Sequence, residues 1–333
     1  MRAASAPRAR GERRLLLLDR ATGSVGDAQL DELPTLVRPG DLFVVNDAAT
    51  LPASLPARAP SGAPMEVRLV RARDDGRRWQ AVALGAGDWR TPTERRPAPE
   101  PLAAGARLEI AGLPATVTAL SRTSVRLFEL RFENEADEVW TAIYRRGRPI
   151  QYAHVPEPLA LWSVQTAYAA RPWAVEMPSA GRPLTWEILL ALRRRGVGVA
   201  TLTHAAGLAS TGDAALDAAL PWPERYEIPG RTAAAIIAAR AAGRRVIAVG
   251  TTVVRALEAS GGRAGAGVAT LVLGPATPLR VASGLITGLH VPGESHFELL
   301  RAFAPAEQLE RVLGAARAAG LSGHELGDAC LIA

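Results

Sequence analysis

Lysine is absent from this 333-residue chain, and its absence excludes several classes of enzyme. All 39 basic residues are arginine, against 33 acidic residues. Phosphate-loop NTPases hold the transferred phosphates with a lysine, and protein kinases carry one on a core strand. Pyridoxal enzymes and Schiff-base aldolases use a lysine amine as nucleophile. None of these classes fits the chain.

Cysteine and long apolar runs are equally scarce. The single cysteine, Cys330, excludes an internal disulfide framework and a cysteine-cluster metal site. No stretch reaches the roughly 20 apolar residues of a membrane helix. The basic N-terminus has only Leu15 to Leu18 as its apolar part, which is too short for an export signal. We therefore expect a cytoplasmic protein that does not enter a membrane.

The rest of the composition is that of a globular protein, 48% hydrophobic and 22% charged. The net charge of +6 is compatible with a polyanionic partner such as RNA. Charge alone does not decide for one, because the high content of arginine, alanine and glycine also matches the codon bias of a GC-rich genome.

Two patterns of elements divide the chain. From Ser61 onward, short strand-like segments are separated by glycine, proline and charged turns, which is typical of a small all-β unit or barrel. After about Pro149, helices alternate with strands as in an α/β layer. We predict a main α/β domain formed by residues 1–58 and 149–333, with a small barrel-like β domain inserted at 59–148.

The α/β half predicts alternating helices and strands whose ends are marked by glycine. The expected helices are 184–196, 230–243, one beginning after Gly250, and 306–320, and the expected strands are 197–203, 244–250 and 269–274. The glycine-rich stretch 261–267 follows a helix and is expected to be a flexible loop.

Polar residues follow the predicted strands, where open α/β sheets bind their ligands. Gly250, Thr251 and Thr252 offer hydroxyls and helix N–H groups to a carboxylate or a ribose; the alternative is a threonine that only caps the helix. Asn46 and Asp47 close the strand "DLFVVND", where they either orient a substrate or form an ordinary turn.

Two further segments carry candidate residues. Ser179, Ala180 and Gly181 precede a helix, and small residues there let a ligand approach the backbone; the alternative is a plain helix entry with Thr185 as cap. Asp328 precedes the last apolar segment and is either a site residue or a turn aspartate.

The five histidines are poorly spaced for a metal. His290 and His296 flank "VPGES" without an obvious third ligand, while His154 and His204 lie far away in the sequence. No G-x-S-x-G elbow marks a serine hydrolase, and no G-x-G-x-x-G follows a strand. We expect no metal site.

Taken in order, these segments resemble the S-adenosylmethionine:tRNA ribosyltransferase-isomerase family of queuosine biosynthesis. The resemblance runs through "RRLLLLDRATG", "GDLFVVNDAATLPASL", "MEVRLV", "VQTAYA", "PSAGRPLT", "VIAVGTTVVRALE", "GLITGLHVPGES" and "LGDACLI". It covers nearly the whole chain, the β insertion included, and implies the family's fold.

The resemblance implies a reaction without a cofactor, in which S-adenosylmethionine is a substrate. In that family a base removes the C5′ proton beside the sulfonium, and the ribosyl unit joins the aminomethyl group of a 7-deazaguanine in tRNA. Adenine and methionine leave, and the product carries an epoxycyclopentane. Such chemistry requires a general base and a dry pocket.

The resemblance also implies roles for residues at the expected strand ends and helix starts. The implied substrate-binding residues are Asn46, Asp47, Tyr168, Ser179, Ala180, Gly181, Gly250, Thr251, Thr252, Arg255 and Asp328. The candidates for acid–base work are His290 and His204.

Several positions depart from the family's usual motifs. Ala49 and Ser54 stand where arginines are expected, and the segment 287–295 lacks its lysine. Fewer basic groups weaken contact with phosphate or carboxylate. Two other hypotheses therefore stay open: a diverged paralogue that uses S-adenosylmethionine with a different, small-molecule acceptor, and a non-catalytic binder of a nucleoside or RNA.

Overall fold

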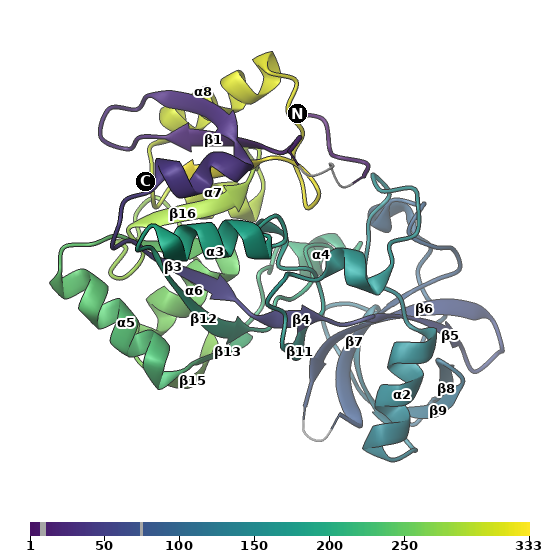
Figure 1. The fold of residues 1–333 in the computed structure, drawn as a ribbon. Coiled ribbons are helices and arrows are strands. Elements are labelled where there is room, and N and C mark those ends of the chain that lie inside the picture. Colours follow the sequence, from purple (N-terminus) through teal and green to yellow (C-terminus); the bar gives the residue numbers. More distant parts are fainter. Residues whose placement is uncertain (7–10, 74–75) are drawn as a thin grey trace.

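The computed structural model describes residues 1–6, 11–73 and 76–333. These residues form a nine-stranded sheet with helices, a closed six-stranded barrel and a two-stranded sheet. Figure 1 shows the large sheet and the barrel as two lobes, with the two-stranded sheet of β4 (Ala48–Thr50) and β11 (Arg171–Ala174) between them. Among the described residues, no helix has both the length and the apolar character needed to span a membrane.

The nine-stranded sheet takes strands from both ends of the chain, which confirms the predicted α/β fold. Its strands are β1 (Arg14–Leu18), β2 (Val25–Gln29), β3 (Leu42–Asn46), β12 (Gly198–His204), β13 (Glu224–Ile228), β14 (Val246–Val249), β15 (Gly265–Ala269), β16 (Gly284–Gly288) and β17 (Ala329–Ile332). They lie in the order β15-β13-β12-β3-β14-β16-β17-β1-β2. Because β12, β3, β14 and β16 run parallel, their carboxyl ends meet at one edge, called here the C-terminal edge.

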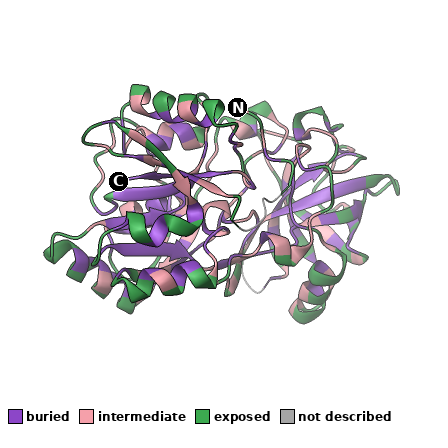
Figure 2. Cartoon of the chain, turned by 45° about the horizontal axis from the view of Figure 1, so that its top comes forward, coloured by how far each residue is buried: buried purple, intermediate pink, exposed green. Residues whose placement is uncertain are grey.

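Helices cover both faces of this sheet, so its central strands are buried along their whole length, as in β3 and β14. The main-domain helices are α1 (Leu33–Leu36), α3 (Trp186–Arg194), α4 (Ala214–Asp217), α5 (Gly230–Ala241), α6 (Thr251–Ser260), α7 (Ser295–Leu300) and α8 (Ala306–Ala318), with short 3-10 turns η1 (Leu30–Glu32), η3 (Leu161–Val164) and η4 (Ser179–Gly181). Figure 2 shows the buried strands between helices whose outer faces are exposed.

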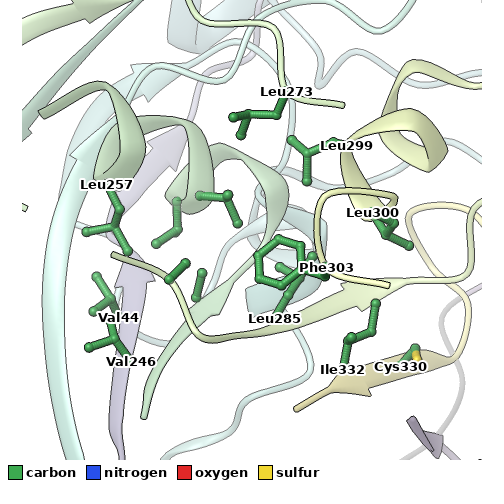
Figure 3. Close-up of a cluster of buried hydrophobic side chains, with 14 of the residues drawn as sticks. Val44, Val246, Leu257, Leu273, Leu285, Leu299, Leu300, Phe303, Cys330 and Ile332 are labelled. Atoms are coloured by element: carbon green, nitrogen blue, oxygen red, sulfur yellow. The ribbon is translucent and has the colours of Figure 1, made fainter. Parts of the chain in front are cut away.

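The larger of the two cores beside the sheet is apolar throughout. Figure 3 shows Val44 and Val246 of the sheet beside Leu257 of α6, with Leu299, Leu300 and Phe303 from the chain around α7. On the other face, α1 and α3 bury a second cluster that includes Phe43 and Leu192. Burial contributes about 25 cal/mol per Å² of apolar surface, so the two clusters hold the sheet rigid and fix its C-terminal edge.

The inserted β unit is a closed antiparallel barrel, as predicted. Its strands are β5 (Ser54–Arg58), β6 (Pro64–Ala72), β7 (Arg78–Leu84), β8 (Arg107–Ile110), β9 (Leu113–Leu120) and β10 (Leu127–Phe132). Its interior is filled by large side chains such as Trp79, Phe128 and Phe132. The Pro-rich loop between β7 and β8 contains the turn η2 (Thr93–Arg95). The barrel strands begin at Ser54; the division of the chain at residues 58 and 149 stays a prediction.

The helices predicted in the α/β half are present, with ends that differ by a few residues. Several details differ from expectation, and the short helices α4 and α7 were not predicted. The stretch 261–267 is not simply a loop, because β15 begins at Gly265 and pairs antiparallel with β13. The strand predicted at 269–274 is wrong beyond Ala269. The helix α2 (Ala136–Arg146), which follows the barrel, was not predicted. Strands pair through backbone hydrogen bonds, which do not require apolar side chains. The glycine-rich sequence of β15 therefore shows no strand pattern and resembles a loop.

Candidate active site

The C-terminal edge collects most of the residues singled out in the sequence. Asn46 ends β3 and Asp47 follows it, His204 ends β12, and Gly250 follows β14. Asp328 stands at the same edge, because it precedes β17, which runs antiparallel to β16. Parallel sheets bind ligands at this edge. The candidate residues named here therefore lie where a ligand site is expected.

The turn at Gly250 brings two predicted segments together. Gly250 has φ of +97°, a region that favours glycine, and its N–H donates to Ile286 O at 2.8 Å. A side chain there would begin 3.5 Å from the Ala180 Cβ of η4. Gly250 itself is the N-cap of α6, and no side chain caps this helix, so Thr251 and Thr252 do not serve as caps. They lie in its first turn, beside η4.

Tyr168 completes this wall of the site. A Cβ at Gly181 would overlap the Tyr168 hydroxyl, so the glycine is required by close approach. That hydroxyl is buried and has no hydrogen-bond partner among the described residues. Burial, with the nearby charge of Asp47, raises the pKa of Tyr168 far above its ordinary value, so the phenol keeps its proton. A buried donor without a partner is costly unless a ligand accepts from it.

His290 lies on the loop after β16 and is held by two side chains. Its Nδ1 is 3.3 Å from Glu294 Oε2, and its Nε2 is 3.2 Å from Thr287 Oγ1. A carboxylate can only accept, so we assign the proton of the neutral ring to Nδ1, which leaves Nε2 as a proton acceptor. Burial raises the pKa of Glu294, but its hydrogen bonds with the His290 ring and the Val291 N–H outweigh burial and lower that pKa. A carboxylate behind an imidazole is the usual arrangement of an oriented base.

Arg255 points into the protein interior. Its guanidinium donates to the Glu224 carboxylate and to the carbonyls of Trp222 (3.2 Å), Ala269 (3.0 Å) and Leu271 (3.2 Å). The side chain is only 5% exposed. The guanidinium donates to these interior acceptors. Arg255 therefore joins α6 to β13 and β15 and does not face an open pocket. Its substrate-binding role stays a prediction without geometric support.

His204 lies in the same interior network. It is fully buried, and its Nε2 is 3.5 Å from Glu224 Oε2. Neither ring nitrogen has a hydrogen-bond partner among the described residues. Burial and the charge of Arg255 lower the pKa of His204 to about 3, so the ring is neutral at physiological pH. A base of that strength in that position is poorly suited to remove a proton, which favours His290 of the two candidates.

The lowered pKa of His204 predicts a pH-dependent stability. The ordinary histidine pKa of 6.5 applies to the unfolded chain, so between pH 6.5 and about 3 only the unfolded state binds the extra proton. Folding stability should therefore fall as the pH is lowered through this window, by up to about 1.4 kcal/mol per pH unit from this group. Urea unfolding at pH 7 and pH 5 measures it, with His204→Asn compared with the wild type. If the free energy of unfolding falls by the same amount between pH 7 and pH 5 in both proteins, His204 does not cause the pH dependence.

Asn46 and Asp328 fasten the backbone around the site. Asn46 Nδ2 donates to His204 O at 2.9 Å, and its Oδ1 accepts from His204 N at 2.9 Å. Asp328 accepts from Arg14 N and Ser322 N, each at 3.0 Å. Both side chains are buried. They hold the ends of β3 and β12 together and close the 322–328 loop, so the geometry supports a structural role for each.

Two functional candidates were missed in the sequence, Tyr152 and Glu176. They line a cavity together with His154, Met177 and Glu325. The Tyr152 hydroxyl and the Ala209 N–H both donate to Glu176. Burial nevertheless raises the pKa of Glu176 to about 7, so this carboxyl can exchange a proton near neutral pH. The two residues lie 24 positions apart with no motif between them, so the sequence held no signal for the pair.

A second, larger cavity has walls from both lobes. Its lining includes the half-buried Trp173 and Trp222, which supply flat apolar surfaces, and also Trp79 of the barrel, which is only 1% exposed. Arg225 stacks over the Trp173 ring at 4.0 Å. Aromatic walls with a stacked guanidinium suit a planar heterocycle such as a nucleobase.

Comparison with known proteins places the chain among enzymes of one pathway. Residues 1–332 match the family model described as queuosine biosynthesis protein. An S-adenosylmethionine:tRNA ribosyltransferase-isomerase of Thermus thermophilus is 35% identical over 322 residues, covering 92% of this chain and 88% of that one. The enzyme of the same name from Acidithiobacillus ferrooxidans is 35% identical over 335 residues, covering 97% and 92%.

The fold is also found in a solved structure. The S-adenosylmethionine tRNA ribosyltransferase of Thermotoga maritima superposes with a TM-score of 0.54 over 99% of this chain and 96% of that chain, at 23% identity. At this level of identity the likeness shows that the two chains share a fold. The architecture of a sheet with an inserted barrel is therefore common to both.

Proposed function

This chain belongs to the queuosine biosynthesis protein family, and we infer that it acts as an S-adenosylmethionine:tRNA ribosyltransferase-isomerase at the C-terminal edge of its sheet. The reaction moves the ribosyl unit of S-adenosylmethionine onto a 7-deazaguanine base in tRNA, with loss of adenine and methionine. Epoxyqueuosine is the product. The observation that carries this conclusion is the match to enzymes of this activity over nearly the whole of both chains.

We place the S-adenosylmethionine subsite beside the start of α6. Support comes from the position of Ala180 beside Gly250 and from the Tyr168 hydroxyl, which has no hydrogen-bond partner among the described residues. The first-turn N–H groups and hydroxyls of Thr251 and Thr252 suit a carboxylate or ribose hydroxyls. A site assembled from a rigid strand end, a helix start and a tight turn is held in place without rearrangement.

The candidate general base is His290. Removal of the C5′ proton beside a sulfonium needs a proton acceptor, and Nε2 of His290 is the unprotonated nitrogen when Glu294 accepts from Nδ1. The Thr287 hydroxyl lies 3.2 Å from this Nε2, so a substrate proton would take its place. The His290 side chain is 18% exposed, so a substrate can reach it. Glu176, whose pKa burial raises to about 7, is the other candidate for taking or giving a proton. Substitution of His290 or of Glu176 shows which of the two is the general base.

The tRNA subsite follows from the larger cavity. A deazaguanine base is planar, and the tryptophan-lined cavity between the lobes offers stacking surfaces for it. Arg71 and Arg225 line the same cavity and can contact the adjoining phosphates. The positive net charge of the chain favours the approach of a polyanion.

Adenine release tests the function directly. The purified full-length chain is incubated with S-adenosylmethionine and one of three acceptors: tRNA carrying the aminomethyl-deazaguanine precursor, the same tRNA without it, or the free base. We expect adenine only with the precursor tRNA. Release with the free base or another small acceptor would instead support a diverged paralogue. If calorimetry shows no binding of S-adenosylmethionine, both enzymatic hypotheses fail.

A further inference from the structure

Four of the chain's five histidines gather at one place in the fold. The rings of His154 and His324 lie 5.0 Å apart, and those of His290 and His296 lie 4.8 Å apart. A Cβ at Gly288 would be 3.8 Å from both His290 Nε2 and His324 O, so the two pairs are neighbours. The proposed base uses only the second pair, which leaves His154 and His324 without an assigned role.

Two loops present the first pair, and a buried side chain fastens each loop. Gln151 donates to Val155 O at 2.9 Å and to Glu157 O at 3.0 Å, which closes the loop that carries His154. On the opposite loop, Asp328 accepts from Ser322 N, and Gly327 N donates to His324 O at 3.1 Å. His324 is thereby held at φ +64°, a conformation uncommon for residues with a side chain.

An apolar cluster pins the two loops against each other. Val155, next to His154, packs with Leu326, next to Glu325, and with Ala4 of the N-terminal segment. All three are buried. The neighbouring polar side chains are therefore presented toward one another by a rigid frame, although their positions are separated by 171 residues in the sequence. Such support is what keeps ligand atoms in a defined geometry.

We propose that His154, His324 and Glu325 bind a divalent transition-metal ion of the zinc class. One ligand atom from each residue lies within 4.8 Å of the other two. His154 Nε2 is already 2.9 Å from Glu325 Oε2. Bonds of about 2.0–2.2 Å in a tetrahedral zinc site place ligand atoms roughly 3.3–3.5 Å apart, so modest side-chain adjustments suffice.

The donor set selects the class of ion. Two imidazoles and one carboxylate suit zinc and its neighbours in the first transition series, whereas magnesium and calcium take oxygen ligands. Three protein ligands leave a fourth position for water or another molecule. His154 and Glu325 also line the cavity that Tyr152 and Glu176 share, so a molecule bound there lies within reach of the ion.

Metal binding by the full-length chain tests the site, and it requires no enzymatic activity. After treatment with a chelator and its removal, the protein is titrated with Zn²⁺ in competition with a chromophoric chelator, and separately with Co²⁺ while its visible spectrum is followed. We expect one ion per chain and an absorption typical of four-coordinate cobalt. The variants His154→Gln and Glu325→Gln should each weaken zinc binding by more than about 10-fold.

Matched variants keep the result interpretable. His324→Asn retains a residue that tolerates the left-handed conformation and should weaken binding as the other two do. His296→Gln removes an imidazole of the neighbouring pair and should leave zinc binding unchanged, while circular dichroism checks that each variant is folded. Zinc binding that is absent from the wild type, survives all three ligand substitutions, or is lost in His296→Gln would overturn the assignment.

Discussion

His290→Asn is expected to lower kcat for adenine release by about 100-fold or more, with little change in the KM for S-adenosylmethionine. General-base catalysis contributes about 10²–10⁴ in rate, and asparagine keeps a polar side chain at the position without a basic nitrogen. The substitution removes proton abstraction but leaves the wall formed by Gly250, Ala180 and Tyr168 intact. Steady-state kinetics with precursor tRNA measures the effect.

Companion variants locate the base within the site. Glu294→Gln should cost about 10-fold, because the amide no longer holds the imidazole proton on Nδ1 as a carboxylate does. Glu176→Gln removes the buried carboxyl whose pKa is raised to about 7. A His290→Asn enzyme within threefold of wild type, together with a large loss in Glu176→Gln, would transfer the role of base to Glu176.

Arg255→Met is expected to lower the free energy of unfolding by about 3–5 kcal/mol. Arg255 and Glu224 are an ion pair in the interior, and removing one partner leaves an uncompensated buried charge. The three carbonyls that accept from the guanidinium also lose their donor. Urea unfolding, followed by circular dichroism at neutral pH, measures the loss.

The double variant tests whether the loss comes from this pair. Glu224→Gln in the Arg255→Met background removes the unpaired charge and should recover part of the stability. If Arg255→Met unfolds within 1 kcal/mol of wild type and instead raises the KM for S-adenosylmethionine, the residue contacts substrate, as the resemblance implied. The internal role described here would then be wrong.

The fold was predictable because its signals are local. The barrel strands show short apolar segments between turns, and the helices α3, α5 and α8 end where glycine follows. β15 was missed because its pairing with β13 depends on backbone hydrogen bonds, for which the glycine-rich sequence carries no side-chain pattern. The helix α2 was missed because it follows the barrel inside a region whose overall pattern is β.

The gathering of most candidate residues at one edge was predictable in outline, since strand ends of a parallel sheet share an edge. Asp47 and Gly250 follow neighbouring strands, and the sheet brings them to the same side. The role of each side chain was not predictable. Whether Arg255 faces a pocket or an interior carboxylate depends on Glu224, which lies 31 positions away and carries no motif.

Side chains that are far apart in the sequence but close in the fold could not be paired from the sequence alone. His154 and Glu325 are 171 positions apart, and they meet because the loop after the barrel and the loop before the last strand pack through Val155 and Leu326. Sequence spacing finds metal ligands only when they share a helix or a short loop. The absence of a metal-binding motif in the sequence therefore did not indicate whether ligand-type side chains on these two loops lie close together.

The fate of the ribose carbons tests the central claim most directly. The chain is incubated with precursor tRNA and with S-adenosylmethionine that is labelled with ¹³C throughout its ribose. The tRNA is then digested, and the masses of its nucleosides are measured by mass spectrometry. We predict that the labelled ribose carbons appear in the modified nucleoside, with adenine and methionine released in equal amounts. A label that stays on S-adenosylmethionine, or transfer of its methyl group alone, would contradict a ribosyltransferase-isomerase.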